Sequence, residues 1–283
     1  MSWIKEVFGK DKAIIGLCHL KALPNDPWYD EKAGMEGVFQ AALADVIALQ
    51  NGGIDGIQFT NEFSIPYVCN TKIDPSTVAA MAVIIGRLRP YLKVPFGANV
   101  IGDTEATIGL CAAVGASWTR GSYHGAWATN EGVLNSDCYN VYRLRHNLHV
   151  DNLKLVHYVV PESSKDVADR DPVTILKAHY FLNKPDALGI CGLVAGQKVD
   201  VELLSRFRNA YPDAVLFAVT GVNKDNVEEI MSIADAAFVG SSLKVDRVFE
   251  NPVDENNVRE LMNAMKNLGK YEQTDIRFIK ANY

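Results

Sequence analysis

The sequence contains few cysteines and arranges them in no recognisable pattern. Its five cysteines are scattered over 283 residues, and no two of them form a Cys-x-x-Cys pair. An odd number of cysteines without such spacing is typical of neither a zinc framework nor a disulfide scaffold. Cys18 and Cys191 lie in apolar stretches, where a free thiol usually serves as a small hydrophobic side chain. We therefore expect packing, and not metal or disulfide bonds, to hold the fold together.

Long apolar stretches and basic clusters are also missing. No segment offers 18 uninterrupted apolar residues, as a membrane-spanning helix would. The N-terminal stretch MSWIKEVFGKDKAIIG lacks the charged start and long apolar run of a signal peptide. The formal net charge is −6 and no basic run occurs, which argues against binding to nucleic acid or to an anionic membrane. The chain is expected to be cytoplasmic.

The sequence has neither a Gly-x-Gly-x-x-Gly motif nor a low-complexity linker. An open doubly wound sheet that binds a dinucleotide would carry such a motif. Short apolar stretches instead alternate with longer amphipathic ones. They predict strands at Ala13–His19, Gly56–Asn61, Pro95–Ile101, Ser117–Gly121, Lys154–Val160, Ala187–Cys191, Ala214–Thr220 and Ala236–Gly240. Helices are predicted over Met35–Gln50, Pro75–Tyr91, Asp103–Val114, Asp137–Asn147, Asp171–Leu182, Asp200–Ala210, Lys224–Ile233 and Glu255–Leu268. This alternation favours a single (β/α)8 TIM barrel over residues 1–283.

The strongest functional signal lies in residues 214–244, where two predicted strands each end in a turn of small residues. Glycine lets the main chain approach a ligand closely, and N–H groups that lead into a helix attract anions. The loops after the seventh and eighth strands of such barrels commonly hold a phosphate. We interpret these turns as a phosphate site, with ordinary tight turns as the alternative; the residues concerned are Thr220, Gly221, Val222, Gly240, Ser241 and Ser242.

Polar residues close several of the otherwise apolar strands, at the end where barrel enzymes carry their active sites. The candidate catalytic residues are His19, Glu62, Asn99, Arg120 and His157. Glu62 suits a general acid or base, because the apolar residues that follow it would shield it from water. A buried guanidinium needs a carboxylate or an anionic ligand. For Arg120, the alternative is a structural ion pair with Glu62 or Asp103. For each histidine, the alternative is a hydrogen-bonded position in the core, and for Asp103 it is helix capping.

The residues that Schiff-base chemistry or a dedicated metal site would need are missing from the expected positions. The sixth predicted strand has no lysine, which a Schiff-base aldolase of the usual barrel design would need. No His-x-His, no His-Glu-x-x-His and no tight cluster of histidines with carboxylates occurs, so no dedicated metal site is indicated. A loosely held divalent ion bound by Glu62 and Asp103 is kept as an alternative.

Aromatic residues gather in the long loops that follow the first and fourth strands. Trp28, Tyr29, Tyr123 and Trp127 lie there, and we interpret them as surface residues. They could stack on a sugar or base as a lid over the site, or bury a contact between subunits of a homo-oligomer.

Five segments together resemble the BtpA/SgcQ family of barrel proteins, and the resemblance covers most of the chain. They are IIGLCHLKALPNDPWY (14–29), GGIDGIQFTNEFSIPY (52–67), PFGANVIGDTEATIGLCAAVGASWTRGS (95–122), WATNEGVL (127–134) and FAVTGVNKDNVEEIMSIADAAFVGSSLKVD (217–246). The resemblance implies a barrel similar to phosphate-binding (β/α)8 barrels. It implicates His19, Pro24, Asn61, Glu62, Pro66, Asn99, Asp103, Arg120, Gly132, Gly221, Asn226, Gly240–Ser242 and Lys244. The stretch HYVVPES (157–163) departs from the family pattern.

The leading hypothesis is an enzyme that acts on a phosphorylated sugar or a related metabolite by proton transfer, isomerisation or bond cleavage. Glu62 would be the general acid/base and His19 a second proton carrier, while Arg120 and Asn99 would hold an anionic or carbonyl oxygen. A phosphate anchored away from the reacting bond would supply orientation. Since the family is linked both to sugar-utilisation gene clusters and to photosystem I assembly, a non-catalytic assembly factor is the first alternative. A metal-dependent nucleoside-phosphate hydrolase is the second.

Overall fold

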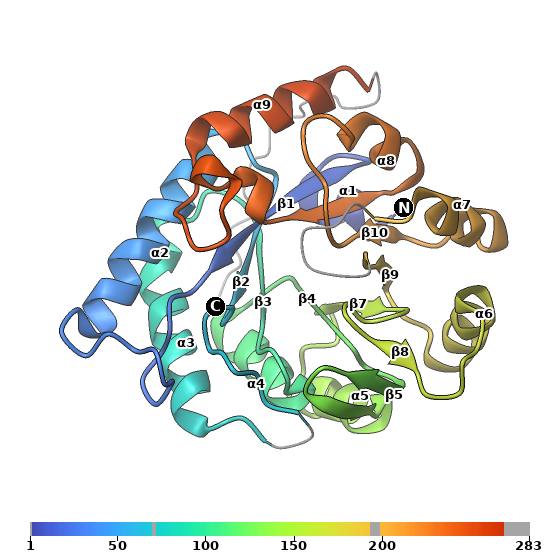
Figure 1. The fold of residues 1–283 in the computed structure, drawn as a ribbon, viewed down its shortest axis with the longest axis horizontal. Helices are drawn as coiled ribbons and strands as arrows, with labels where there is room; N and C mark the ends of the chain where they lie inside the picture. Colours follow the sequence, from blue (N-terminus) through green and yellow to red (C-terminus); the bar gives the residue numbers. More distant parts are fainter. Residues whose placement is uncertain (1, 70–71, 193–198, 269–283) are drawn as a thin grey trace.

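The computed structural model describes residues 2–69, 72–192 and 199–268. Within them a closed barrel of parallel strands runs in the order β1-β11-β10-β9-β7-β4-β3-β2 (Figure 1). Its strands are β1 (Ala13–His19), β2 (Gly56–Thr60), β3 (Phe96–Asn99), β4 (Trp118–Gly121), β7 (Lys154–Tyr158), β9 (Ala187–Ile190), β10 (Leu216–Ala218) and β11 (Ala236–Val239). Each lies within a predicted strand, so the predicted TIM barrel is confirmed.

Helices connect the strands and cover the outside of the barrel (Figure 1). They are α2 (Gly34–Asn51), α3 (Pro75–Leu88), α4 (Thr104–Val114), α5 (Cys138–Asn147), α6 (Pro172–Asn183), α7 (Val201–Ala210), α8 (Val227–Ile233) and α9 (Glu255–Lys266). Short 3-10 helices are η1 (Arg89–Tyr91), η2 (Ser241–Leu243) and η3 (Val245–Arg247). Aspartates cap many of the α-helices. Asp74 and Asp171, each followed by proline, accept main-chain N–H groups of the first turn, because those groups have no partner within the helix.

A short N-terminal helix, α1 (Trp3–Phe8), contributes its apolar side chains to the core inside the barrel. The Trp3 ring stacks on Phe217 with 5.7 Å between centroids, and Phe8 lies 5.2 Å from Trp118. Both partners are on strands, so α1 fills part of the barrel interior. The sequence pattern did not predict this helix, because six residues are too few to show a helical period.

Gly97 on β3 leaves room for a buried hydrogen bond inside the barrel. Trp118 Nε1 donates to Gln58 Oε1 at 2.7 Å, and Gln58 Nε2 donates to Asn99 Oδ1 at 3.0 Å. A Cβ atom on Gly97 would lie 2.3 Å from Trp118 Nε1 and 2.6 Å from Gln58 Oε1. The absence of a side chain at Gly97 therefore allows two consecutive hydrogen bonds to link β4, β2 and β3.

A small antiparallel sheet lies outside the barrel and was not predicted. It has the order β6-β5-β8, from β5 (Gly125–Thr129), β6 (Gly132–Ser136) and β8 (Lys165–Asp166). Residues 122–136, which follow the fourth barrel strand, were expected to form a long loop. Pairing with the distant β8 through Trp127 and Asp166 completes the sheet, and local sequence carries no sign of such a contact.

None of the helices in the described part of the chain combines the length and apolar character needed to cross a membrane.

Replacement of Gly97 by alanine is expected to lower the free energy of unfolding by about 1–3 kcal/mol, the usual cost of overpacking a core. Urea denaturation measures this change. Gly86 is the matched control, since it lies inside α3 and a Cβ atom added to it would meet nothing within 4 Å. Gly86→Ala should raise stability by roughly 0.5–1 kcal/mol. Equal effects of the two substitutions would contradict this account of Gly97.

Candidate active site

Inward-facing polar side chains meet at the carboxyl ends of the first four barrel strands. Side chains alternate between the two faces of a strand. Ala13, Ile15 and Leu17 of β1 pack in the core inside the barrel, so His19 faces the same way. By the same alternation Asn99 follows Gly97, and Arg120 follows the inward Trp118. The structure thus brings together His19, Glu62, Asn99 and Arg120 of the predicted catalytic set.

His19 is 5% exposed and lies close to Glu62, with 4.0 Å between Nε2 and Glu62 Oε2. Neither ring nitrogen has a hydrogen-bond partner among the described residues. Burial lowers the pKa of His19 to about 4, against the opposing charge of Glu62 and with help from nearby cations including Lys244. The imidazole is therefore neutral at pH 7. A Cβ on Gly240 would lie 3.2 Å from His19 Cε1, so glycine at the end of β11 makes room for this ring.

The Glu62 carboxylate is oriented from its own strand. Thr60 Oγ1 donates to Glu62 Oε2 at 2.7 Å, and the hydroxyl of Tyr67 donates to the main-chain carbonyl of Glu62 at 2.8 Å. The Glu62 side chain keeps 21% of its surface exposed. A carboxylate held in this way and still open to solvent can exchange protons with a ligand.

Arg120 is 8% exposed, and its guanidinium lies over the Phe238 ring at 4.8 Å from the centroid. Its Nε atom is buried without a hydrogen-bond partner, and no ion pair to it is found within residues 2–69, 72–192 and 199–268. The alternative of a structural pair with Glu62 or Asp103 is not what the structure shows. Asp103 caps α4 instead, accepting from the N–H groups of Ala106 and Ile73.

Two asparagines lie at the carboxyl ends of β2 and β3. The Oδ1 atom of Asn99 accepts from Gln58, which fixes the orientation of its amide. Asn61 is 1% exposed; its Oδ1 accepts from the N–H of Ile101 at 2.8 Å, while its Nδ2 is buried with no partner among the described residues.

Sequence reasoning missed a second carboxylate. Glu162 follows β7, and burial together with the charge of Glu62 raises its pKa, while Arg120 lowers it. Its charge also acts on Tyr158 and Cys191. An acid shortly after a strand end is the same signal that identified Glu62. At Glu162 this signal is obscured, because residues 157–163 depart from the family pattern.

The two turns of the predicted phosphate site lie side by side. Ser242 Oγ donates to the carbonyl of Val222 at 2.7 Å and joins the turns, and Thr220 Oγ1 accepts from the N–H of Gly192. Gly221 has a φ of 66°, a conformation that favours glycine. Among the described residues, no hydrogen bond uses the main-chain N–H of Gly221, Val222, Ser241 or Ser242.

His157 lies apart from the other predicted catalytic residues. Its neighbour Val156 belongs to the core inside the barrel, so His157 points outward to the helices. There it is fully buried, with Nδ1 3.0 Å from His179 Nε2 and Nε2 3.3 Å from the Tyr142 hydroxyl. Burial lowers the pKa of His157 well below its usual value. The alternative of a core histidine fits this position, and its predicted catalytic role does not.

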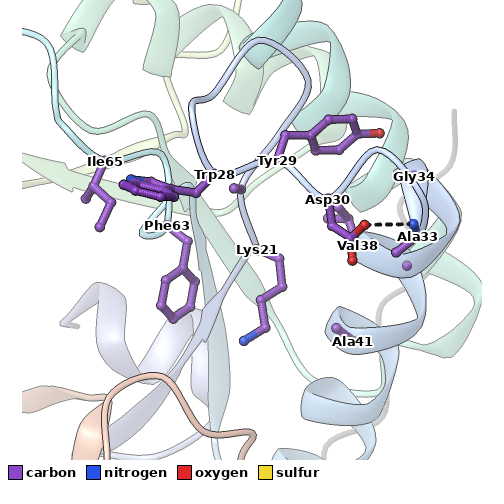
Figure 2. A pocket seen from close by; sticks show the side chains of 12 residues that line it. Lys21, Trp28, Tyr29, Asp30, Ala33, Gly34, Val38, Ala41, Phe63 and Ile65 are labelled. Carbon is purple, nitrogen blue, oxygen red and sulfur yellow. Dashed lines mark hydrogen bonds between the residues drawn. The ribbon is translucent and has the colours of Figure 1, made fainter.

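The predicted lid residues separate in the structure. Tyr123 and Trp127 are fully buried, so their interpretation as surface aromatics was wrong. Trp127 lies on β5, and Tyr123 lies between β4 and β5 with its ring 4.6 Å from that of His157. Trp28 is 73% exposed. It lines a groove of about 560 Å³ beside the site, together with Tyr29, Lys21 and Phe63 (Figure 2).

The described residues contain no group of three or more histidine, cysteine, aspartate or glutamate side chains arranged to hold a metal ion. Asp103, one of the two residues considered for a divalent ion, uses its carboxylate to cap α4.

The fold and the inward polar cluster define a TIM-barrel protein with a candidate site at the carboxyl end of its strands. The sequence profile of the BtpA family matches residues 10–267, and the chain belongs to that family. It is 43% identical over 268 residues to SgcQ of Escherichia coli strain K12, covering 95% of this chain and 99% of SgcQ. It is 26% identical over 262 residues to the photosystem I biogenesis protein BtpA of Synechocystis, covering 92% and 90%.

Solved structures show the same fold at low sequence identity. The native KDPGal structure has a TM-score of 0.53 and 14% identity, covering 91% of this chain and 96% of that one. N-(5′-phosphoribosyl)anthranilate isomerase from Pyrococcus furiosus has a TM-score of 0.53 and 13% identity, covering 90% and 99%. Thiamine phosphate pyrophosphorylase from the same organism has a TM-score of 0.53 and 14% identity, covering 91% and 96%.

The protein is expected to lose stability as the pH falls from 6.5 to 4. Burial lowers the pKa of His19 and of His124 to about 4 and that of His179 to about 3. The unfolded chain binds protons in this interval that the folded chain does not, so the free energy of unfolding decreases with decreasing pH. His19 alone contributes about 3 kcal/mol.

Urea denaturation at several pH values measures this dependence. His19→Asn should remove about 3 kcal/mol of it between pH 6.5 and 4. An unchanged slope in the variant would show that the imidazole of His19 is as accessible to protons in the folded chain as in the unfolded one.

Proposed function

We propose that this protein is an enzyme that binds a phosphorylated sugar or a related small metabolite in the barrel mouth and catalyses proton transfer on it. One observation carries the proposal: buried polar atoms of three residues at the carboxyl end of the barrel have no hydrogen-bond partner among the described residues. These are both ring nitrogens of His19, Nε of Arg120 and Nδ2 of Asn61. Leaving such groups unpaired costs about 1–3 kcal/mol each, and more for a charged group. A ligand with several oxygens would satisfy them.

The charges around this space assign a role to each residue. Arg120 and Asn99 would hold an anionic or carbonyl oxygen, as a guanidinium and an amide do. Glu62 would remove a proton from the adjacent carbon. Glu162, whose pKa is raised by burial and by the charge of Glu62, would return a proton to the ligand. Two carboxyl groups that face one ligand can divide the roles of general base and general acid between them.

The turns after β10 and β11 support a phosphate in the proposal. The main-chain N–H groups of Gly221, Val222, Ser241 and Ser242, which have no hydrogen-bond partner within residues 2–69, 72–192 and 199–268, are donors of the kind that bind phosphate in such barrels. Lys244 is close enough to His19 to influence its titration, but its charge is paired with Asp45 at 3.6 Å. Solved structures of similar fold include enzymes named for phosphorylated compounds, which agrees with this assignment at the level of the fold.

A non-catalytic stabilising role is a second candidate, and one finding favours it. A relative 26% identical to this chain is named a photosystem I biogenesis protein. This role requires no chemistry in the barrel mouth, so Glu62→Gln and Arg120→Ala would leave cellular function intact. The proposed enzyme would lose its function through either change.

Sugar phosphates are expected to stabilise the protein against heat, by roughly 2.7 kcal/mol at 100 times the dissociation constant. Arg120→Ala and Ser241→Asp should abolish the shift, the first by removing the cation and the second by repelling the anion. Arg143→Ala and Ser232→Asp are matched controls at exposed positions on α5 and α8, and they should retain it. No shift with a broad panel of sugar phosphates would refute the phosphate site.

Proton transfer can be measured without knowledge of the product. In D₂O the enzyme should exchange a carbon-bound hydrogen of a bound sugar phosphate for deuterium, which NMR detects. Glu62→Gln should slow this exchange by about 10²–10⁴-fold, the usual contribution of a general base, while the thermal shift persists. Exchange at the wild-type rate in this variant would remove Glu62 from the reaction.

A further inference from the structure

A groove beside the barrel mouth has one aromatic and one small-residue wall. Figure 2 shows Trp28, Phe63 and Ile65 on one side and the start of α2 on the other, with Lys21 between them. The groove holds about 560 Å³, which is within the range of sites for small molecules.

The wall formed by α2 is shaped to leave space. Ala33, Gly37 and Ala41 line the groove and are four residues apart, so they share one face at the start of the helix. A Cβ atom on Gly37 would lie 2.5 Å from the Cβ of Ala33. Small side chains on this face keep the groove open opposite Trp28.

The aromatic wall is poorly covered by the protein itself. Trp28 is 73% exposed and Ile65 is 40% exposed. When a ligand covers large apolar side chains that line a concavity and are exposed to water, the free energy of the system falls. The face of an indole is suited to a flat ring, because offset aromatic pairs attract each other beyond the burial of their area.

The groove adjoins the barrel mouth through Phe63 and Lys21. The Phe63 ring lies 6.3 Å from that of His19, between centroids. Lys21 Nζ lies 4.7 Å from the centre of the Phe63 ring, and its charge lowers the pKa of His19. A ligand with one group near His19 can therefore extend past Phe63 toward Trp28.

We propose that the groove binds a flat, uncharged aromatic ring carried by the phosphorylated ligand, so that the substrate class is an aryl-substituted sugar phosphate. This inference rests on the proposed function for its phosphate, while the ring is recognised by the groove alone. A second copy of the chain is the other possible cover for Trp28, and the dependence of its exposure on protein concentration separates the two.

The fluorescence of Trp28 can report whether a ligand covers its side chain. The other three tryptophans are buried, with Trp3 at 8% exposed and Trp118 and Trp127 at 0%, so acrylamide quenches chiefly the fluorescence of Trp28. The probes are phenyl β-D-glucoside 6-phosphate, methyl β-D-glucoside 6-phosphate, and phenyl β-D-glucoside without phosphate. Both phenyl probes should protect Trp28 from acrylamide, and the methyl probe should not. The phenyl phosphate should bind on the order of tenfold more tightly than the methyl phosphate.

Two variants locate the ring. Trp28→Ala should make the phenyl and methyl phosphates bind equally, and Ala41→Phe should do the same by filling the groove. Ile47→Phe is the matched control, because Ile47 is an exposed residue of α2 outside the groove lining. It should preserve the preference for phenyl. In all three variants the methyl phosphate should bind as it does to the wild-type protein.

Protection of Trp28 by neither phenyl probe would overturn this inference, whatever the methyl phosphate does. Failure of the methyl phosphate to bind, with Trp28 still protected by phenyl β-D-glucoside, would instead refute the phosphate site and support the groove. Protection of Trp28 that grows with protein concentration in the absence of ligand would assign the groove to a second copy of the chain and overturn the inference.

Discussion

The structure depends on how the interior of a closed eight-stranded barrel is filled. Inward side chains must occupy that space at close-packed density. Trp118, Phe217 and Phe238, joined by the rings of α1, fill the deeper part. The Trp118–Gln58–Asn99 chain of hydrogen bonds continues from this packing to the carboxyl end. This chain fixes the amide of Asn99, whereas several other polar groups at this end have no partner among the described residues.

Burial and nearby charges set the protonation of the groups at the carboxyl end of the barrel. His19 stays neutral because burial outweighs the nearby carboxylate of Glu62, and the guanidinium of Arg120 lies over the ring of Phe238. Bringing a neutral imidazole, a guanidinium and two carboxyl groups together at the carboxyl end of the barrel is costly for stability. The groove beside Trp28 adjoins the same region through Phe63 and Lys21 and adds apolar surface to it.

Sequence reasoning succeeded where local patterns express the fold. Alternation of apolar stretches located every barrel strand, and the Asp-Pro pairs at 74–75 and 171–172 marked helix starts. It located His19, Glu62, Asn99 and Arg120, because a polar residue that ends a parallel strand must reach the carboxyl edge. It failed for His157, since one position along a strand separates the interior from the helix layer. It also failed for Trp127, whose strand pairs with the distant β8, and for Tyr123, which packs against His157.

The amino-acid sequence by itself determined the barrel and the polar character of its carboxyl end, since both follow from periods of two and about 3.6 residues that any window of the chain displays. Only the tertiary structure decided which polar groups have no partner among the described residues, and that Glu162 lies near Glu62. It also decided that Trp28 is exposed to solvent while Tyr123 and Trp127 are buried. These properties arise from contacts between residues far apart in the chain, where burial and distance set the charge of each group.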